Sequence, residues 1–125
     1  MSYNGWSNYE TWNVALWIDN DKGTYNLVRE QAREFLNNAD QILKDKQDGL
    51  SGCYPKSITA EDSARYDFAQ WLKDFVNEMA PDLGATMYSD LLSAALSDVD
   101  WDEIVRHWLD DVGDEMELER IQATK

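Results

Sequence analysis

The expectation of a helical fold starts from residues 7–21, which read SNYETWNVALWIDND. Ser7 and Glu10 have the spacing of a capping box, in which each side chain accepts a hydrogen bond from the other residue's backbone N–H at a helix start. This predicts a helix over roughly residues 8–19. Its apolar residues, from Trp12 to Ile18, lie all around the helix axis, which is typical of a buried helix. We therefore expect this N-terminal helix at the centre of the fold.

Four more helices are expected downstream, over roughly residues 25–45, 60–79, 86–97 and from Trp101 onward. In each of them apolar residues recur three or four positions apart. Thr24 and Thr59 are the expected N-caps of the first two, and Asp100 with Glu103 repeats the capping-box spacing before the last. Gly113 is expected to kink or end that last helix.

The predicted fold class is all-α, a single compact domain over residues 1–125 with about five helices. A chain of this length fits one domain and can bury about two thirds of its unfolded surface. Residues 49–55, GLSGCYP, interrupt the helical pattern and are predicted to form a loop. The alternation of apolar and polar residues that is typical of strands is scarce. A small sheet would most readily lie in residues 49–58, and none is predicted.

The net charge is strongly negative, because 25 acidic residues face 11 basic ones, which gives −14. Residues 98–125 hold ten acids and three bases, so half of the net charge lies in the last 28 residues. Such a surface repels nucleic acid and anionic lipid and favours basic partners. The alternative interpretation is that the charge serves solubility alone.

Cellular location is inferred from features that are missing. Cys53 is the only cysteine, so no internal disulfide can form and nothing indicates an oxidising compartment. The first residues lack the basic and apolar segments of a signal peptide. No apolar run approaches the roughly 20 residues that cross a bilayer. We therefore expect a cytoplasmic protein without a membrane partner.

The sequence gives little support for catalytic activity. His107 is the only histidine and lies in a tryptophan-rich stretch, so a structural or surface role is favoured over a general base. A thiol–imidazole pair of Cys53 and His107 is conceivable, but a lone loop cysteine is more often incidental. Neither a nucleophile elbow nor a glycine-rich phosphate loop is present. We expect no enzyme activity and no cofactor.

Metal binding is also not expected. One cysteine and one histidine do not make a zinc site. Asp98, Asp100 and Asp102 have the spacing of the first calcium ligands of an EF-hand, but Glu103 stands where that loop requires glycine. The stretch from Asp19 to Gly23 places its glycine one position early. Helix capping explains both acidic clusters without a metal.

An acidic stripe on the last helix is the candidate functional feature. On a helical wheel five carboxylates fall within about one third of the circumference, away from the tryptophans, and span roughly 22 Å. They belong to Asp102, Glu103, Asp110, Asp114 and Glu117, and Asp98, Asp100 and Asp111 are their neighbours. Duplex DNA carries a phosphate about every 3.4 Å of axis on each strand, so the stripe could imitate a short phosphate track. Arg106 lies inside the stripe and weakens the likeness. The alternative is an ordinary solvated helix face. The predicted partner-binding residues are Asp98, Asp100, Asp102, Glu103, Asp110, Asp111, Asp114 and Glu117.

Two motifs carry a resemblance. Residues 5–21, GWSNYETWNVALWIDND, and residues 99–105, VDWDEIV, resemble a family of small uncharacterised proteins encoded by phages, plasmids and their prokaryotic hosts. The likeness covers both ends of the chain. The resemblance implies a mobile-element context and carries no catalytic residue. Small acidic phage proteins often act against host defences such as restriction enzymes and CRISPR complexes.

The resulting hypothesis is a phage- or mobile-element-type inhibitor that acts as an acidic nucleic-acid mimic. It would occupy the basic groove of a host nucleic-acid-binding defence complex, in the host cytoplasm, without binding nucleic acid itself. The alternative is a small adaptor or regulator that binds a protein through an aromatic or apolar surface. The tryptophans and tyrosines of residues 6–17 fit either a buried core or such a surface.

Overall fold

The computed structural model describes residues 3–49 and 59–123, and these residues form six helices and no strand. The helices are α1 (Tyr9–Asn20), α2 (Lys22–Asn37), α3 (Ala39–Gly49), α4 (Ala60–Met79), α5 (Met87–Ser97) and α6 (Trp101–Ala123). The all-α class is thereby confirmed, with six helices in place of about five. Cys53 and residues 50–58, for which a loop or a small sheet was considered, lie outside the described residues.

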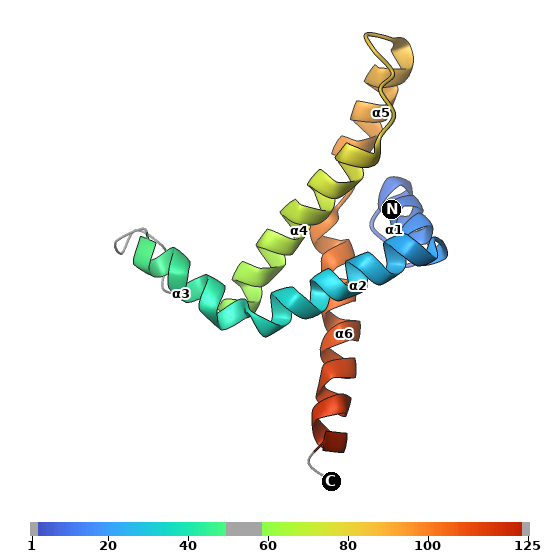
Figure 1. Cartoon of the computed structure of the whole chain (residues 1–125). Helices are drawn as coiled ribbons and strands as arrows, with labels where there is room; N and C mark the ends of the chain where they lie inside the picture. Colours follow the sequence, from blue (N-terminus) through green and yellow to red (C-terminus); the bar gives the residue numbers. More distant parts are fainter. Residues whose placement is uncertain (1–2, 50–58, 124–125) are drawn as a thin grey trace.

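The additional helix arises at Asn38, which divides the helix expected over residues 25–45 into α2 and α3. Asn38 has φ −103° and ψ 7°, outside the helical range, and its N–H donates to the carbonyl groups of Glu34 and Leu36. Neither glycine nor proline, the usual helix-breaking residues, is present at this position. A break in the helix at Asn38 was therefore not predicted from the sequence. Figure 1 shows the change of direction between α2 and α3.

The buried centre of the molecule is formed by α2, α4 and α6. Both α2 and α4 pack against α6, and α4 also packs against α2 and α3 (Figure 1). Val28 of α2, Phe68 and Leu72 of α4 and Ile104 of α6 are completely buried. The hydrophobic effect of covering these side chains holds the three helices together.

The expected central position of the N-terminal helix is wrong. Only Thr11, Ala15 and Ile18 of α1 are buried, whereas the Trp17 side chain is 68% exposed. The helix therefore packs mainly through one face, against α2 and α6, while Tyr9, Leu16 and Trp17 are exposed. Apolar residues on all sides permit burial but do not require it, because the neighbouring helices determine which face is covered.

Two of the expected helix starts are confirmed. The Thr59 hydroxyl accepts the Asp62 N–H at 3.1 Å at the start of α4. Before α6, the Asp100 carboxylate accepts the Glu103 N–H at 3.1 Å. The Glu103 side chain does not complete that capping box, because it accepts hydrogen bonds from Ser7 instead.

Two other cap predictions are wrong by a few residues. Asn8, and not Ser7, caps α1, since its side chain accepts the Thr11 N–H at 2.9 Å. Asp21, and not Thr24, caps α2, with the Thr24 N–H as donor at 3.0 Å. Asn8 and Asp21 directly precede the first residues of α1 and α2, and both are residue types that cap helices at least as well as serine or threonine.

Gly113 lies inside α6, which continues through it from Trp101 to Ala123, so the expectation that it ends the helix is also wrong. A Cβ at this position would lie 3.9 Å from the Leu36 side chain of α2. No helix among residues 3–49 and 59–123 is long and apolar enough to cross a membrane.

Candidate functional site

The candidate site is the outer face of α6, the longest helix in the described part of the chain. The inner face buries Ile104, Val105, Trp108 and Val112 against the other helices. The opposite face is therefore directed to solvent. Six of the eight predicted partner-binding residues lie on α6, while Asp98 and Asp100 lie in the short connection from α5.

Two of these residues contribute to internal contacts. The Asp102 carboxylate lies 2.8 Å from Arg65 Nε of α4 and 3.1 Å from Arg106 Nε, so it links α4 to α6. The Glu103 carboxylate accepts the Ser7 N–H at 3.0 Å and the Ser7 hydroxyl at 2.7 Å. Both residues are half-buried, and Asp102 pairs with two arginines.

Three more residues of the predicted set have local partners. Glu117 forms an ion pair with Arg120, one turn further along α6. Asp100 accepts the Glu103 N–H as the cap of that helix. Asp98 ends α5, and its backbone carbonyl accepts a hydrogen bond of 2.7 Å from the Asn8 side chain. All three residues are exposed.

Asp110, Asp111 and Asp114 form the part of the face that remains available to a partner. All three are exposed, and within the described residues none takes part in a hydrogen bond or an ion pair through its side chain. Asp110 and Asp114 are one turn apart, a spacing at which like charges destabilise a helix by about 0.2–0.5 kcal/mol. The repulsion between these two carboxylates therefore slightly destabilises α6.

A groove between α4 and α6 extends the negative surface to one side. It encloses about 310 Å³, and its lining includes Asp110 and Asp114 together with Glu61 and Asp62 of α4. Arg65 and Arg106 also line the groove. Asp62 at 3.4 Å and Asp102 engage the Arg65 guanidinium, and Asp102 also pairs with Arg106.

A second groove, between α1 and α6, extends the surface to the other side. It encloses about 550 Å³ and brings Asp19 of α1 near Asp111, beside the rings of Tyr25 and Trp108. Partial burial raises the pKa of Asp19, and the negative charge of Asp111 raises it further. The two carboxylates therefore repel each other across this groove.

His107 borders the same groove and packs against an aromatic ring. Its imidazole lies 4.3 Å from the Trp6 ring, measured between ring centroids. Trp6 is placed there by a tight turn in which Tyr3 and Trp6 exchange backbone hydrogen bonds. Gly5, with φ 89°, adopts the left-handed conformation that such an Asn-Gly turn requires. A packing role for His107 is consistent with this contact.

Sequence reasoning missed Asp19, Glu61 and Asp62 as members of this surface. Their positions along the chain are far from residues 98–117, and only the packing of α1 and α4 against α6 brings them close. No spacing rule could have found them. Among the described residues, no group of three or more histidine, cysteine, aspartate or glutamate residues is placed to hold a metal ion.

A family model described as a family of unknown function (DUF7249) matches residues 1–122 of the chain. The chain belongs to this family. No curated protein and no solved structure matches the chain. The DUF7249 match confirms the resemblance to an uncharacterised family and assigns no role to any residue.

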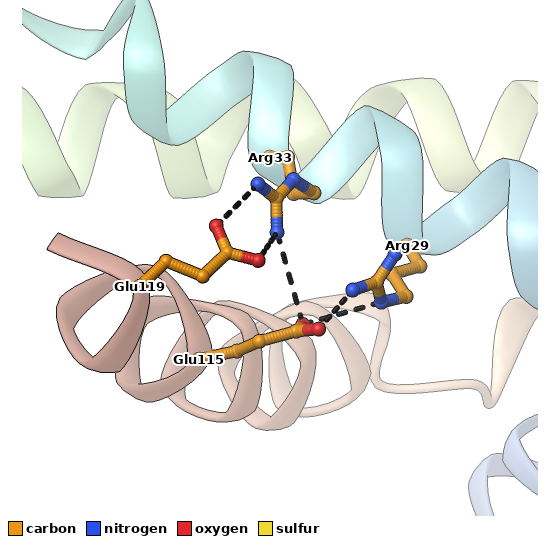
Figure 2. Close-up of polar contacts among 4 residues, drawn as sticks. All are labelled: Arg29, Arg33, Glu115 and Glu119. Atoms are coloured by element: carbon orange, nitrogen blue, oxygen red, sulfur yellow. Dashed lines mark hydrogen bonds and ion pairs between the residues drawn. The ribbon is translucent and has the colours of Figure 1, made fainter. Parts of the chain in front are cut away.

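A second set of charged residues in this DUF7249 protein links α2 to α6. Figure 2 shows Arg29 and Arg33 of α2 pointing toward Glu115 and Glu119 of α6. Arg29 pairs with Glu115, while Arg33 lies 2.7 Å from Glu119 and 4.0 Å from Glu115. The Arg33 guanidinium lowers the pKa of Glu119 below its usual value. These contacts fix α6 against α2 and leave the outer face free.

The proximity of Asp19 and Asp111 gives a prediction for pH dependence. Because the folded-state pKa of Asp19 is raised, the protein loses stability as the pH rises from the ordinary aspartate pKa to the raised one. Replacing Asp111 with asparagine should lower the pKa of Asp19 and stabilise the protein at neutral pH by a few tenths of a kcal/mol. NMR titration of the Asp19 carboxyl group and urea unfolding measure the two effects.

The control for this prediction is Asp114→Asn, which removes the same charge from the opposite side of the outer face. It should leave the pKa of Asp19 nearly unchanged. An Asp19 pKa that is equal in the wild type and in Asp111→Asn would contradict the contribution assigned to the Asp111 charge.

Proposed function

We propose that this DUF7249 protein is a phage- or mobile-element-type inhibitor that binds the basic groove of a host nucleic-acid-binding defence complex. The outer face of α6 would occupy the place of nucleic-acid phosphates. The observation that supports this proposal is the exposure of Asp110, Asp111 and Asp114 without cationic partners among the described residues.

The physical argument rests on unbalanced charge held on a rigid element. Carboxylates on a helix that is packed against α2 and α4 lose little conformational freedom when a partner binds. Lysine and arginine side chains of a basic groove would form charge-assisted hydrogen bonds with them and relieve their mutual repulsion. The new hydrogen bonds and the relief of repulsion would both make the free energy of binding more favourable.

The geometry allows an approximate match to a nucleic-acid backbone. Asp110 and Asp114 are separated by about 6 Å along the helix axis, given a rise of about 1.5 Å per residue. Phosphates on one DNA strand follow each other about every 3.4 Å of axis, so the two carboxylates correspond to nearly every second phosphate. Asp19 on one side and Glu61 and Asp62 on the other widen the negative surface.

The proposal depends most on three of the eight predicted partner-binding residues. Asp102, Glu103 and Glu117 are engaged by Arg65, Arg106, Ser7 and Arg120 and would contribute only weakly. Asp98 and Asp100 would contact a partner only at the edge of the face. The central contribution is assigned to Asp110, Asp111 and Asp114.

The test begins with capture of the partner from a host lysate by the full chain, with and without nuclease treatment, followed by its identification. The triple variant Asp110→Asn, Asp111→Asn and Asp114→Asn should bind the captured complex at least ~100-fold more weakly, if each lost ion pair contributes ~1 kcal/mol or more. Its helix content should equal that of the wild type, because none of the three side chains takes part in a hydrogen bond or an ion pair within the described residues.

The matched control removes three exposed acids from α2 and α3, with Glu30→Gln, Glu34→Gln and Asp40→Asn. It changes the net charge by the same amount and should bind within about twofold of the wild type. Equal loss in both triple variants would show that only net charge matters and would contradict the proposal. A partner that is lost on nuclease treatment would be held through nucleic acid, which also contradicts it.

The alternative function, an adaptor or regulator that binds through an apolar surface, is favoured by one observation. Trp17 is 68% exposed in a groove that Val14, Ile18, Val76 and Met79 also line. A partner bound there would be retained by the aspartate triple variant and at high salt, and it would be lost on Trp17→Ala.

A further inference from the structure

Helix α5 is apolar yet buries none of its residues. Its sequence is MYSDLLSAALS, and every one of these residues is at least partly exposed to solvent. Met87, Tyr88 and Leu91 are each at least 60% exposed. Figure 1 shows α5 projecting away from the body of the molecule, beyond the end of α4. An isolated helix of this length is only marginally stable in water, so α5 would be stabilised by a surface that covers its apolar side.

A complementary groove lies between α1 and the end of α4. It encloses about 370 Å³ and is lined chiefly by Val14, Trp17, Ile18, Val76 and Met79. Trp17 is 68% and Met79 53% exposed, so this groove is also uncovered in the single chain.

The charge of the two surfaces argues against a basic partner. The helix α5 carries one charged residue, Asp90, and the groove lining carries one, Asp21. The whole chain has a net charge of −14, so these are weakly charged areas of a strongly acidic protein. Their ligand would be another weakly charged, apolar protein surface.

The exposed area is near what a stable dimer needs. Five large side chains are more than half exposed on the two surfaces, namely Met87, Tyr88, Leu91, Trp17 and Met79. At roughly 100–150 Å² each, they offer on the order of 500–750 Å² per chain, against about 800 Å² per partner in a standard interface. Neighbouring half-buried residues of α5, such as Leu92, would add to this area.

We propose that the occupant is a second copy of this chain. The α5 helix of each copy would pack into the α1–α4 groove of the other, which closes a twofold dimer. Each chain carries both a projecting apolar helix and an apolar groove. In a twofold dimer both helices and both grooves would be covered, and no apolar surface would be left to bind a third copy. This inference does not depend on the proposed inhibitory function.

The test is the dimer dissociation constant of the full chain, measured by analytical ultracentrifugation. Leu91→Glu places a charge on α5 and should weaken the dimer at least ~10-fold. Leu118→Glu is the matched control, since both leucines are 60% exposed and Leu118 lies on the far part of α6. It should dimerise like the wild type. Trp17→Ala should weaken the dimer from the groove side.

Salt provides a second readout. Two chains of charge −14 repel each other, so added salt should tighten the dimer, whereas it should weaken the complex with a basic partner. A wild type that sediments as a monomer at every concentration and salt level would overturn the proposal. Equal weakening by Leu91→Glu and Leu118→Glu, with helix content retained, would also overturn it. A dimer that Trp17→Ala leaves intact would exclude the reciprocal arrangement.

Discussion

Replacing Phe68 with alanine is expected to lower the free energy of unfolding by about 3–5 kcal/mol. Phe68 is completely buried in α4, and its ring lies 5.3 Å from the Phe35 ring of α2 and 6.0 Å from the Trp71 ring. Truncation removes the buried ring and leaves a cavity at the contact of α2 with α4, which the surrounding helices can fill only in part. Urea unfolding, followed by circular dichroism, measures the loss.

The matched control is Tyr66→Ala, which truncates a ring of similar size on the same helix. Tyr66 is 62% exposed, so its replacement should change the free energy of unfolding by less than about 1 kcal/mol. Comparable losses for the two variants would show that α4 does not pack through the face that contains Phe68.

Replacing Thr11 with valine is expected to lower the free energy of unfolding by about 1–3 kcal/mol. Thr11 is completely buried, and its hydroxyl accepts the Asp100 N–H at 2.8 Å. Valine has nearly the same shape but no acceptor, so it would leave this N–H without its partner at the point where the chain enters α6. The bond is a direct link between the N-terminal motif and the start of the helix that carries the candidate site.

Hydrogen exchange at the Asp100 amide isolates the role of the hydroxyl. The amide should lose protection in Thr11→Val and keep most of it in Thr11→Ser, which retains the acceptor. Unchanged protection of the Asp100 amide in Thr11→Val would contradict the proposed link.

The parts of the fold that follow from local chemistry were predictable from the sequence. Thr59 and Asp100 cap the helices that they were expected to cap, because an N-cap acts on amides two or three residues away. The apolar face of α6 was also predicted, since side chains three and four positions apart lie on one side of a helix. Its burial of Ile104 and Trp108 follows that pattern.

The features that could not be predicted from the sequence are those that depend on which helices pack against each other. The motif of α1 is apolar on every side, and nothing within it indicates that Ala15 would be buried and Trp17 exposed. The break at Asn38 carries no glycine or proline. The same is true of the candidate surface. The helical wheel predicted that Asp102 would be available to a partner, but the packing of α4 against α6 places Arg65 beside it.

The measurement that tests the central claim most directly is the affinity for the captured partner as a function of salt concentration. The wild type and the Asp110, Asp111 and Asp114 triple variant would be compared by calorimetry or surface plasmon resonance. If α6 presents carboxylates to a basic groove, the affinity of the wild type falls steeply as salt rises and that of the triple variant changes much less. An affinity of the wild type that stays constant with salt would contradict the account.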